Sequence, residues 1–171
     1  MRSPLLRLLA FGAAFVAVGA AQTMLHQLWA PLGLVDGMMI AVGLIALRAS
    51  FAGAVWAGAI GGLIQDSLAG GIVGLHAFAK TVAAAAMAVV GDFLAIRGQL
   101  AEAMIIAAAA ALEATITRLL LLFLGWPASD GPLIILLRAG ATGIVCGILT
   151  VGVPLLISNY QAWRRRPRLR W

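Results

Sequence analysis

The sequence predicts an all-α integral membrane protein with six transmembrane helices. Of its 171 residues, 63% are hydrophobic and only 11% are charged. Soluble domains are about half apolar and about a quarter charged, so this chain has too little polar surface to cover a globule in water. A spanning helix needs about 20 apolar residues, so the length fits roughly six of them and leaves no room for a separate soluble domain.

Six apolar stretches follow one another along the chain. The first ends at Trp29-Ala30-Pro31 and the fifth at Gly125-Trp126-Pro127, each an aromatic residue of the membrane interface beside a helix breaker. Tight glycine turns and single arginines separate the others. The expected spans are about 5–28, 32–47, 50–68, 72–94, 100–124 and 133–163. They form one transmembrane domain, 1–163, followed by an arginine-rich tail, 164–171.

The basic residues predict the orientation. Alternating the sides of the membrane puts Arg2, Arg7, Arg48, Arg97 and the tail on one side, and leaves no Lys or Arg in the three opposite loops. The positive-inside rule then places both termini in the cytoplasm. As an alternative, Arg2 and Arg7 before an apolar run that reaches Ala21 also resemble a cleavable signal peptide.

The net charge of +6 comes largely from the tail, so it does not indicate nucleic-acid binding. Five arginines directly follow an apolar helix, a pattern typical of a cytoplasmic segment that rests on anionic lipid. These residues are Arg164, Arg165, Arg166, Arg168 and Arg170.

Seven ionisable residues fall inside the expected spans, where an unpaired charge is costly and each one raises a question of function. At 1.5 Å per residue, all seven are expected in the outer half of the membrane, as one polar cluster that opens outward. They are Asp36, Asp66, His76, Lys80, Glu113, Arg118 and Arg138.

Lys80 and Glu113 are expected at nearly the same height on consecutive antiparallel helices, and therefore to pair. Simpler interpretations stay open for the others. The two arginines can extend to the outer interface, and the two aspartates can be helix-end residues in headgroup water. His76 is expected to be a hydrogen-bonded packing residue rather than a metal ligand, because no second histidine stands at ligand spacing.

Glycines four residues apart recur along the chain, and such pairs let helix backbones approach closely in a membrane. We expect them to pack helices within the bundle or, alternatively, to receive a second copy or a partner helix. The pairs are Gly58 with Gly62, Gly70 with Gly74, and Gly143 with Gly147.

The sequence contains no G-x-S-x-G, H-E-x-x-H, P-loop or dinucleotide-binding motif. We therefore expect no enzyme, no cofactor and no metal, although an intramembrane enzyme that assembles its site from scattered residues stays an alternative. Cys146 has no partner for a disulfide within the chain and is expected to be a buried helix residue.

Two segments carry a resemblance to a known family. Gly58-Ala59-Ile60-Gly61-Gly62-Leu63-Ile64-Gln65-Asp66, followed by Gly74-Leu75-His76-Ala77-Phe78, resembles the central signature of the rod shape-determining protein MreD family. Val35-Asp36-Gly37-Met38-Met39-Ile40, running on to Arg48, is similar to the acid and base that flank the family's second span. Size, number of expected helices and the basic tail agree over essentially the whole chain.

This resemblance implies a non-enzymatic scaffold in the bacterial inner membrane that belongs to the elongation (Rod) complex and supports cell shape and lateral peptidoglycan synthesis. The implied partners are an MreC-like bitopic protein, the elongation transpeptidase, the SEDS glycosyltransferase and the MreB-like filament. The implied fold is the six-helix bundle of the substrate-binding subunits, or S-components, of energy-coupling-factor vitamin transporters.

Such a substrate-binding subunit is therefore the alternative function. In that case the outer polar cluster would form the floor of a vitamin pocket. Ala13, Ala17 and Ala21 match the small-residue face that these subunits present to their coupling subunit.

Overall fold

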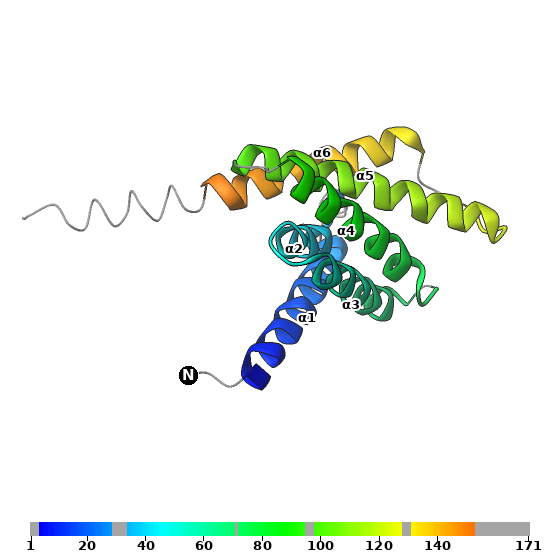
Figure 1. Cartoon of the computed structure of the whole chain (residues 1–171). Coiled ribbons are helices and arrows are strands. Elements are labelled where there is room, and N and C mark those ends of the chain that lie inside the picture. Colours follow the sequence, from blue (N-terminus) through cyan, green and yellow to red (C-terminus); the bar gives the residue numbers. More distant parts are fainter. Residues whose placement is uncertain (1–3, 29–33, 71, 95–97, 128–130, 153–171) are drawn as a thin grey trace, which may run out of the picture.

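The computed structural model describes residues 4–28, 34–70, 72–94, 98–127 and 131–152 (Figure 1). These residues form helices joined by short connections, with no strand among them. The helices are α1 (Pro4–Leu28), α2 (Gly37–Ala46), α3 (Phe51–Ala69), α4 (Leu75–Leu94), α5 (Gln99–Phe123) and α6 (Pro132–Gly147), and α6 continues into a π-helical segment, Ile148–Gly152.

Three helical segments are long and apolar enough to cross a membrane: Leu75–Phe93, Gln99–Phe123 and Pro132–Val151. The helix α3 has 19 residues, but Gln65, Asp66 and several glycines make it less apolar. The chain is therefore a helical membrane protein whose described part forms six α-helices, and these three segments have the length and composition of spans.

The second expected span is shorter than the sequence suggested. We expected a helix over 32–47, but α2 has only 10 residues and a length of about 15 Å, half of a hydrocarbon core of about 30 Å. The cause is Asp36, whose Oδ1 accepts a hydrogen bond of 2.8 Å from the backbone N–H of Met39. Asp36 is thus the N-cap of α2 and not a residue one turn inside it.

The helix pair α3 and α4 has the most extensive contact in the bundle. A Cβ on Gly58 would lie 2.6 Å from the carbonyl oxygen of Lys80, and one on Gly62 would lie 2.6 Å from that of His76. Only glycine permits this approach of two backbones. Gly58 and Gly62 thus lie where the backbones of α3 and α4 are closest.

Gly70 and Gly74 do not form such a face. Both have positive φ, of 64° and 98°, and no atom lies within 4 Å of the position that a Cβ would take on either. Gly70 is the left-handed C-cap of α3, and Gly74 directly precedes α4. Their spacing therefore serves the turn between the two helices, where glycine adopts positive φ without strain.

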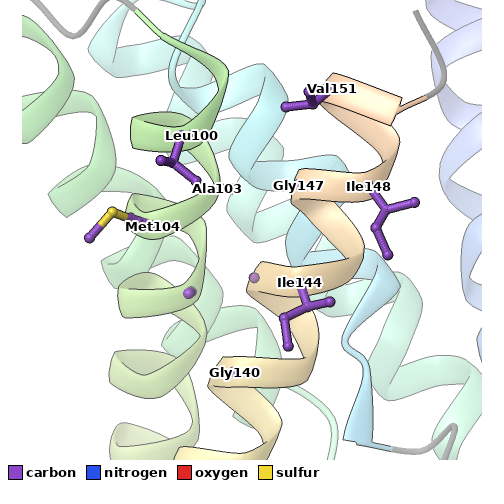
Figure 2. Close-up of a pocket in the computed structure, with 10 residues that line it drawn as sticks. Leu100, Ala103, Met104, Gly140, Ile144, Gly147, Ile148 and Val151 are labelled. Atoms are coloured by element: carbon purple, nitrogen blue, oxygen red, sulfur yellow. The ribbon is translucent and has the colours of Figure 1, made fainter. Parts of the chain in front are cut away.

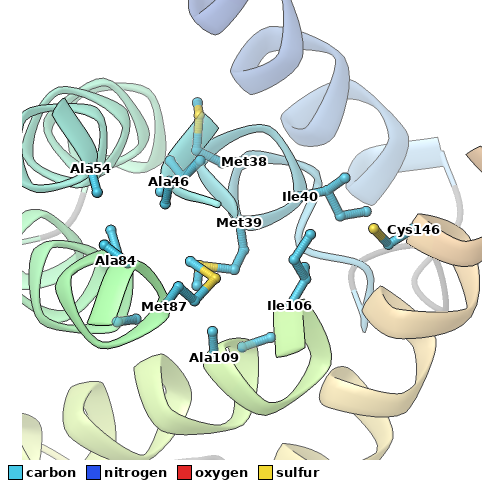
Figure 3. Packing of buried hydrophobic residues seen from close by; sticks show 14 of the residues in the cluster. Met38, Met39, Ile40, Ala46, Ala54, Ala84, Met87, Ile106, Ala109 and Cys146 are labelled. Atoms are coloured by element: carbon cyan, nitrogen blue, oxygen red, sulfur yellow. The ribbon is translucent and has the colours of Figure 1, made fainter. Parts of the chain in front are cut away.

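The short helix α2 lies at the centre of the bundle and contacts every other helix. Figure 3 shows Met39 of α2 directed toward Met87 of α4 and Ile106 of α5, and Ile40 directed toward Cys146 of α6. Met38 lies on another side of α2, close to Gly19 of α1 and Gly61 of α3. Met39 is fully buried and belongs to one core cluster with Met87 and Ile106. Because lipid tails are as apolar as these residues, close van der Waals contact is what stabilises the core.

The helices α5 and α6 pack closely at one point and diverge beyond it. A Cβ on Gly143 would lie 2.7 Å from Cβ of Ala107, whereas one on Gly147 would be 3.8 Å from Cβ of Ala103. Figure 2 shows the apolar groove that results, with a volume of about 590 Å³ and with Leu100 and Val151 at one end. Gly143 therefore acts as a packing residue, and Gly147 lines the groove.

Candidate functional site: a buried ionic cluster

Lys80 is the centre of the candidate site. It is completely buried in the first half of α4, where an unpaired ammonium group would be strongly destabilising. Its Nζ donates a hydrogen bond of 2.5 Å to Oδ2 of Asp36 and lies 3.2 Å from Oε1 of Glu113. One cation thus joins carboxylates from α2 and α5, and the expected pairing of Lys80 with Glu113 is present.

Glu113 has a second partner on α4. Its Oε1 lies 2.9 Å from Nδ1 of His76, one helical turn before Lys80. His76 and Lys80 are four residues apart and therefore share one face of α4, which explains how both reach the same carboxylate. We call Asp36, His76, Lys80 and Glu113 the ionic cluster.

Asp36 connects the ionic cluster to two more elements. One carboxylate oxygen caps α2, the other accepts from Lys80, and its backbone N–H donates a bond of 3.0 Å to Oγ1 of Thr142 in α6. The ionic cluster thereby ties together four helices: α2, α4, α5 and α6. The N-cap position gives Asp36 its reach, because its own backbone is not helical, with φ of −90° and ψ of 88°, and its carboxylate contacts Lys80 of α4.

Asp66 lies beside the ionic cluster and has a separate role. Its carboxylate accepts hydrogen bonds from the backbone N–H groups of Gly74 (2.8 Å), His76 (3.1 Å) and Ala77 (3.2 Å). The first turn of a helix carries unsatisfied donors and a partial positive charge, and a carboxylate satisfies both. Asp66 therefore closes the α3–α4 hairpin and orients the backbone of His76.

The two arginines of the expected cluster line cavities outside the ionic cluster. Arg118 lines a cavity between α5 and α6 beside Thr115 and Leu136. Arg138 lines a cavity with Gln22 of α1 and Gln65 of α3. The acids and the lysine are deeply buried, because each finds its partner inside the bundle.

Sequence reasoning missed two uncharged residues that complete this arrangement. Thr142 is fully buried and accepts from the backbone of Asp36, and Oε1 of Gln22 accepts a bond of 3.0 Å from the N–H of Met38. Both residues supply hydrogen-bond acceptors for backbone N–H groups at the start of α2, which lies inside the bundle. A polar residue on a largely apolar helix was the available signal for each, and it did not indicate the partner.

A second ion pair stands at the opposite end of the bundle. Arg48, after α2, donates to both carboxylate oxygens of Glu102 in the first turn of α5, at 2.8 and 3.1 Å. The Arg48 side chain is 57% exposed, so water screens this pair, in contrast to the ionic cluster.

Three of the four side chains of the ionic cluster are buried, and the fourth, His76, is 23% exposed. Asp36 is 5% exposed, Glu113 2% and Lys80 not at all, so solutes have no access to their charged groups. Within the described part of the chain, no three His, Cys, Asp or Glu side chains are placed to hold a metal ion. The buried Cys146 is packed in the apolar core. The arrangement can fix helices relative to one another.

Several expected features lie outside the described residues. They are the tail arginines Arg164, Arg165, Arg166, Arg168 and Arg170, the loop residue Arg97, the N-terminal Arg2, and the part of the sixth expected span after residue 152. Comparison with protein-family models, with curated proteins and with solved structures gave no match.

Proposed function

We propose that this protein is a non-enzymatic scaffold of the bacterial inner membrane that acts in the elongation (Rod) complex. One observation carries the proposal: the charged groups of the ionic cluster satisfy one another. Lys80 has two carboxylate partners, Glu113 has two cation-forming partners, and Asp36 has bonds to three residues. A substrate pocket needs polar groups that stay available to a ligand, whereas a scaffold needs groups that hold helices together.

The motif that resembles the MreD family supports the same proposal through its structural role. Gly58 and Gly62 permit close contact between α3 and α4, Asp66 caps α4, and Gly74 has the positive φ of the turn. The motif thus specifies a rigid helical hairpin that presents His76 and Lys80 to α2 and α5. The motif therefore determines the geometry of the α3–α4 hairpin, as expected of a scaffold that positions other proteins.

In this proposal, six membrane passes place both termini in the cytoplasm. An MreC-like bitopic protein, the elongation transpeptidase, the SEDS glycosyltransferase and the MreB-like filament are the partners, and the arginine tail contacts anionic lipid. The alternative is a vitamin-binding subunit, in which the ionic cluster would be the pocket floor. The burial of Lys80 and Glu113 argues against that role.

Co-purification tests the proposal. The chain would be co-expressed with the MreC-like protein of the same genome and, separately, with a coupling subunit and its two ATPases. We expect a stable complex with the MreC-like protein only. Glu102→Gln, at the exposed ion pair, should leave this complex intact, whereas Lys80→Met should reduce it. A complex with the transporter components that retains a vitamin-sized molecule would contradict the proposal.

A further inference from the structure

Arg118 is a charged side chain that the scaffold proposal does not use. Its guanidinium group forms no hydrogen bond or ion pair with another residue in the part of the chain that the structure describes. Lys80 and Arg48, in contrast, each have a carboxylate partner. Arg118 lies five residues before the end of α5, about 8 Å inside this span. At that depth a cation needs an anionic group or water, and the long arginine side chain can extend toward the membrane surface to reach one.

Arg118 lines a cavity of about 590 Å³ between α5 and α6, which we call the arginine cavity. Among the described residues no carboxylate lines this cavity, and the hydroxyl of Thr115 already donates to the carbonyl oxygen of Ala111. Two further lining residues, Leu119 and Leu136, are 60% and 67% exposed, so the arginine cavity opens on the outside of the bundle, where the membrane lies. The guanidinium group of Arg118 is therefore available to a ligand that arrives from the membrane.

The start of α6 favours the same sign of ligand charge. Pro132, the first residue of α6, also lines the arginine cavity. The N-terminal end of a helix carries a partial positive charge, which adds to the full charge of Arg118. Both charges favour an anion, and a guanidinium group binds phosphate oxygens with two parallel hydrogen bonds. The rest of the lining is apolar, so the ligand needs an apolar part as well.

The apolar groove between α5 and α6 continues from the arginine cavity along the same two helices. On α5, Ala111 lines the cavity and Ala107 lines the groove; on α6, Leu136 lines the cavity and Gly140 lines the groove. Residues four apart lie on one face of a helix, so the cavity and the groove follow one another along a single seam. Figure 2 shows Gly140 at the end of the groove that lies opposite Val151.

The length of this seam matches one leaflet of a membrane. Ala107 precedes Arg118 by 11 residues, about 16 Å along α5, and half of a hydrocarbon core is about 15 Å. From Arg118 to Ala107, the lining changes from a cation to apolar and small side chains. A membrane lipid changes in the same order from its charged headgroup to its acyl chains.

We propose that the seam of α5 and α6 binds one anionic phospholipid, with its phosphate at Arg118 and an acyl chain in the apolar groove beside Gly140 and Ile144. A soluble anion would leave the groove without an apolar partner. A second copy packed on this face about a twofold axis along the membrane normal would bring its own Arg118 to the same depth, where two cations would repel each other. The site is independent of the proposed scaffold function.

A photoreactive phosphatidylglycerol, with a diazirine near the end of its acyl chain, tests the site in the purified full-length protein in phosphatidylcholine nanodiscs. Crosslinks should map to residues 103–107 and 140–147. Arg118→Gln should lower the yield about fivefold, because it removes a charge-assisted contact with the phosphate, and Arg118→Lys should keep more than about half of it. The matched control is Arg138→Gln in another cavity, which should change the yield less than about twofold.

A second pair of variants tests the groove. Gly140→Phe should block it, because no atom lies within 4 Å of the position that a Cβ would take there. Val89→Phe, at an exposed position on α4, is the control and should leave the yield unchanged. Ile144→Trp also fills the groove from an exposed position, and it replaces Gly140→Phe if that variant does not fold.

Three outcomes would overturn the proposal. Competition by glycerol phosphate would identify a soluble phosphate ligand. Asp130, which lies outside the described residues, is an acid in the connection before α6, and a severalfold higher yield from Asp130→Asn would show that its carboxylate already binds Arg118. Crosslinks spread evenly over the helices, or equal yields from Arg118→Gln and Arg138→Gln, would show ordinary lipid contact.

Discussion

Nζ of Lys80 lies 2.5 Å from Oδ2 of Asp36, a residue 44 positions earlier in the chain. Because Asp36 also caps α2, this ion pair fixes where the central helix begins and how it faces α4. Glu113 adds a second carboxylate to the same lysine from α5. One fully buried cation therefore joins three helices, and its removal should leave two buried carboxylates without their lysine partner.

Replacing glycine by alanine should change the stability in opposite directions at Gly62, where α3 contacts α4, and at Gly140 of α6, which has no close neighbour. Gly62→Ala should destabilise the protein, because its Cβ would meet the backbone of Ala77. Gly140→Ala should stabilise it by up to about 1 kcal/mol, because alanine favours a helix and no atom lies within 4 Å there. Thermal unfolding in detergent measures both changes. A stabilising Gly62→Ala would show that the two helices do not pack as described.

Because Asp66 caps α4, its substitution should strongly lower the free energy of unfolding. Asp66→Ala removes the acceptor of three backbone N–H bonds and should cost on the order of 2 kcal/mol. Asp66→Asn keeps one oxygen acceptor and should cost less. Asp92→Ala, at an exposed position on the same helix, serves as the control and should change the unfolding free energy by less than about 0.5 kcal/mol. Equal losses from Asp66→Ala and Asp92→Ala would contradict this role.

The exposed ion pair of Arg48 with Glu102 should contribute little to the free energy of unfolding, and salt should reduce that contribution. Exposed ion pairs contribute about 0–1 kcal/mol, and salt screens them. A double-mutant cycle with Arg48→Gln and Glu102→Gln should therefore give a coupling energy below about 1 kcal/mol that declines further in 0.5 M salt. A coupling that salt leaves unchanged would mean that this pair is shielded from water, against its exposure in the structure.

The orientation predicts which cysteines react from outside the cell. In a Cys146→Ala background, Ala69→Cys at the end of α3 should be labelled by a membrane-impermeant maleimide in intact cells. Gln99→Cys at the start of α5 should be labelled only after permeabilisation, since the positive-inside rule places that end in the cytoplasm. The opposite pattern would reverse the topology, and labelling of both in intact cells would contradict a membrane-spanning bundle.

The sequence predicted the features that depend on local length and depth. The ranges of α4 and α5 match the expectation closely, and Lys80 and Glu113 meet because consecutive antiparallel helices bring equal depths together. The role of Asp36 was not predictable in this way, since α2 and α4 are not consecutive and their contact depends on the whole bundle. For the same reason, the sequence could not show that Asp36 shortens α2.

The glycine pairs illustrate a second limit. Gly58 with Gly62 and Gly70 with Gly74 have the same spacing, but the first pair lies within a helix and the second flanks a turn with positive φ. Spacing alone does not distinguish the two, because the φ of a glycine depends on whether the helix continues beyond it. Likewise, Arg118 and Arg138 lie at depths that a sequence can estimate, but the cavities that they line exist only in the assembled bundle.

The buried charges around Lys80 hold α2, α4 and α5 together. The most direct measurement is the free energy of unfolding of Lys80→Met and of the triple variant Asp36→Asn, Lys80→Met, Glu113→Gln. The single variant should cost on the order of 3 kcal/mol or more, because two buried carboxylates lose their lysine partner. The triple variant should recover most of this loss, because asparagine keeps the cap of α2 and no charge is left unpaired. A triple variant that is less stable than Lys80→Met would contradict the claim.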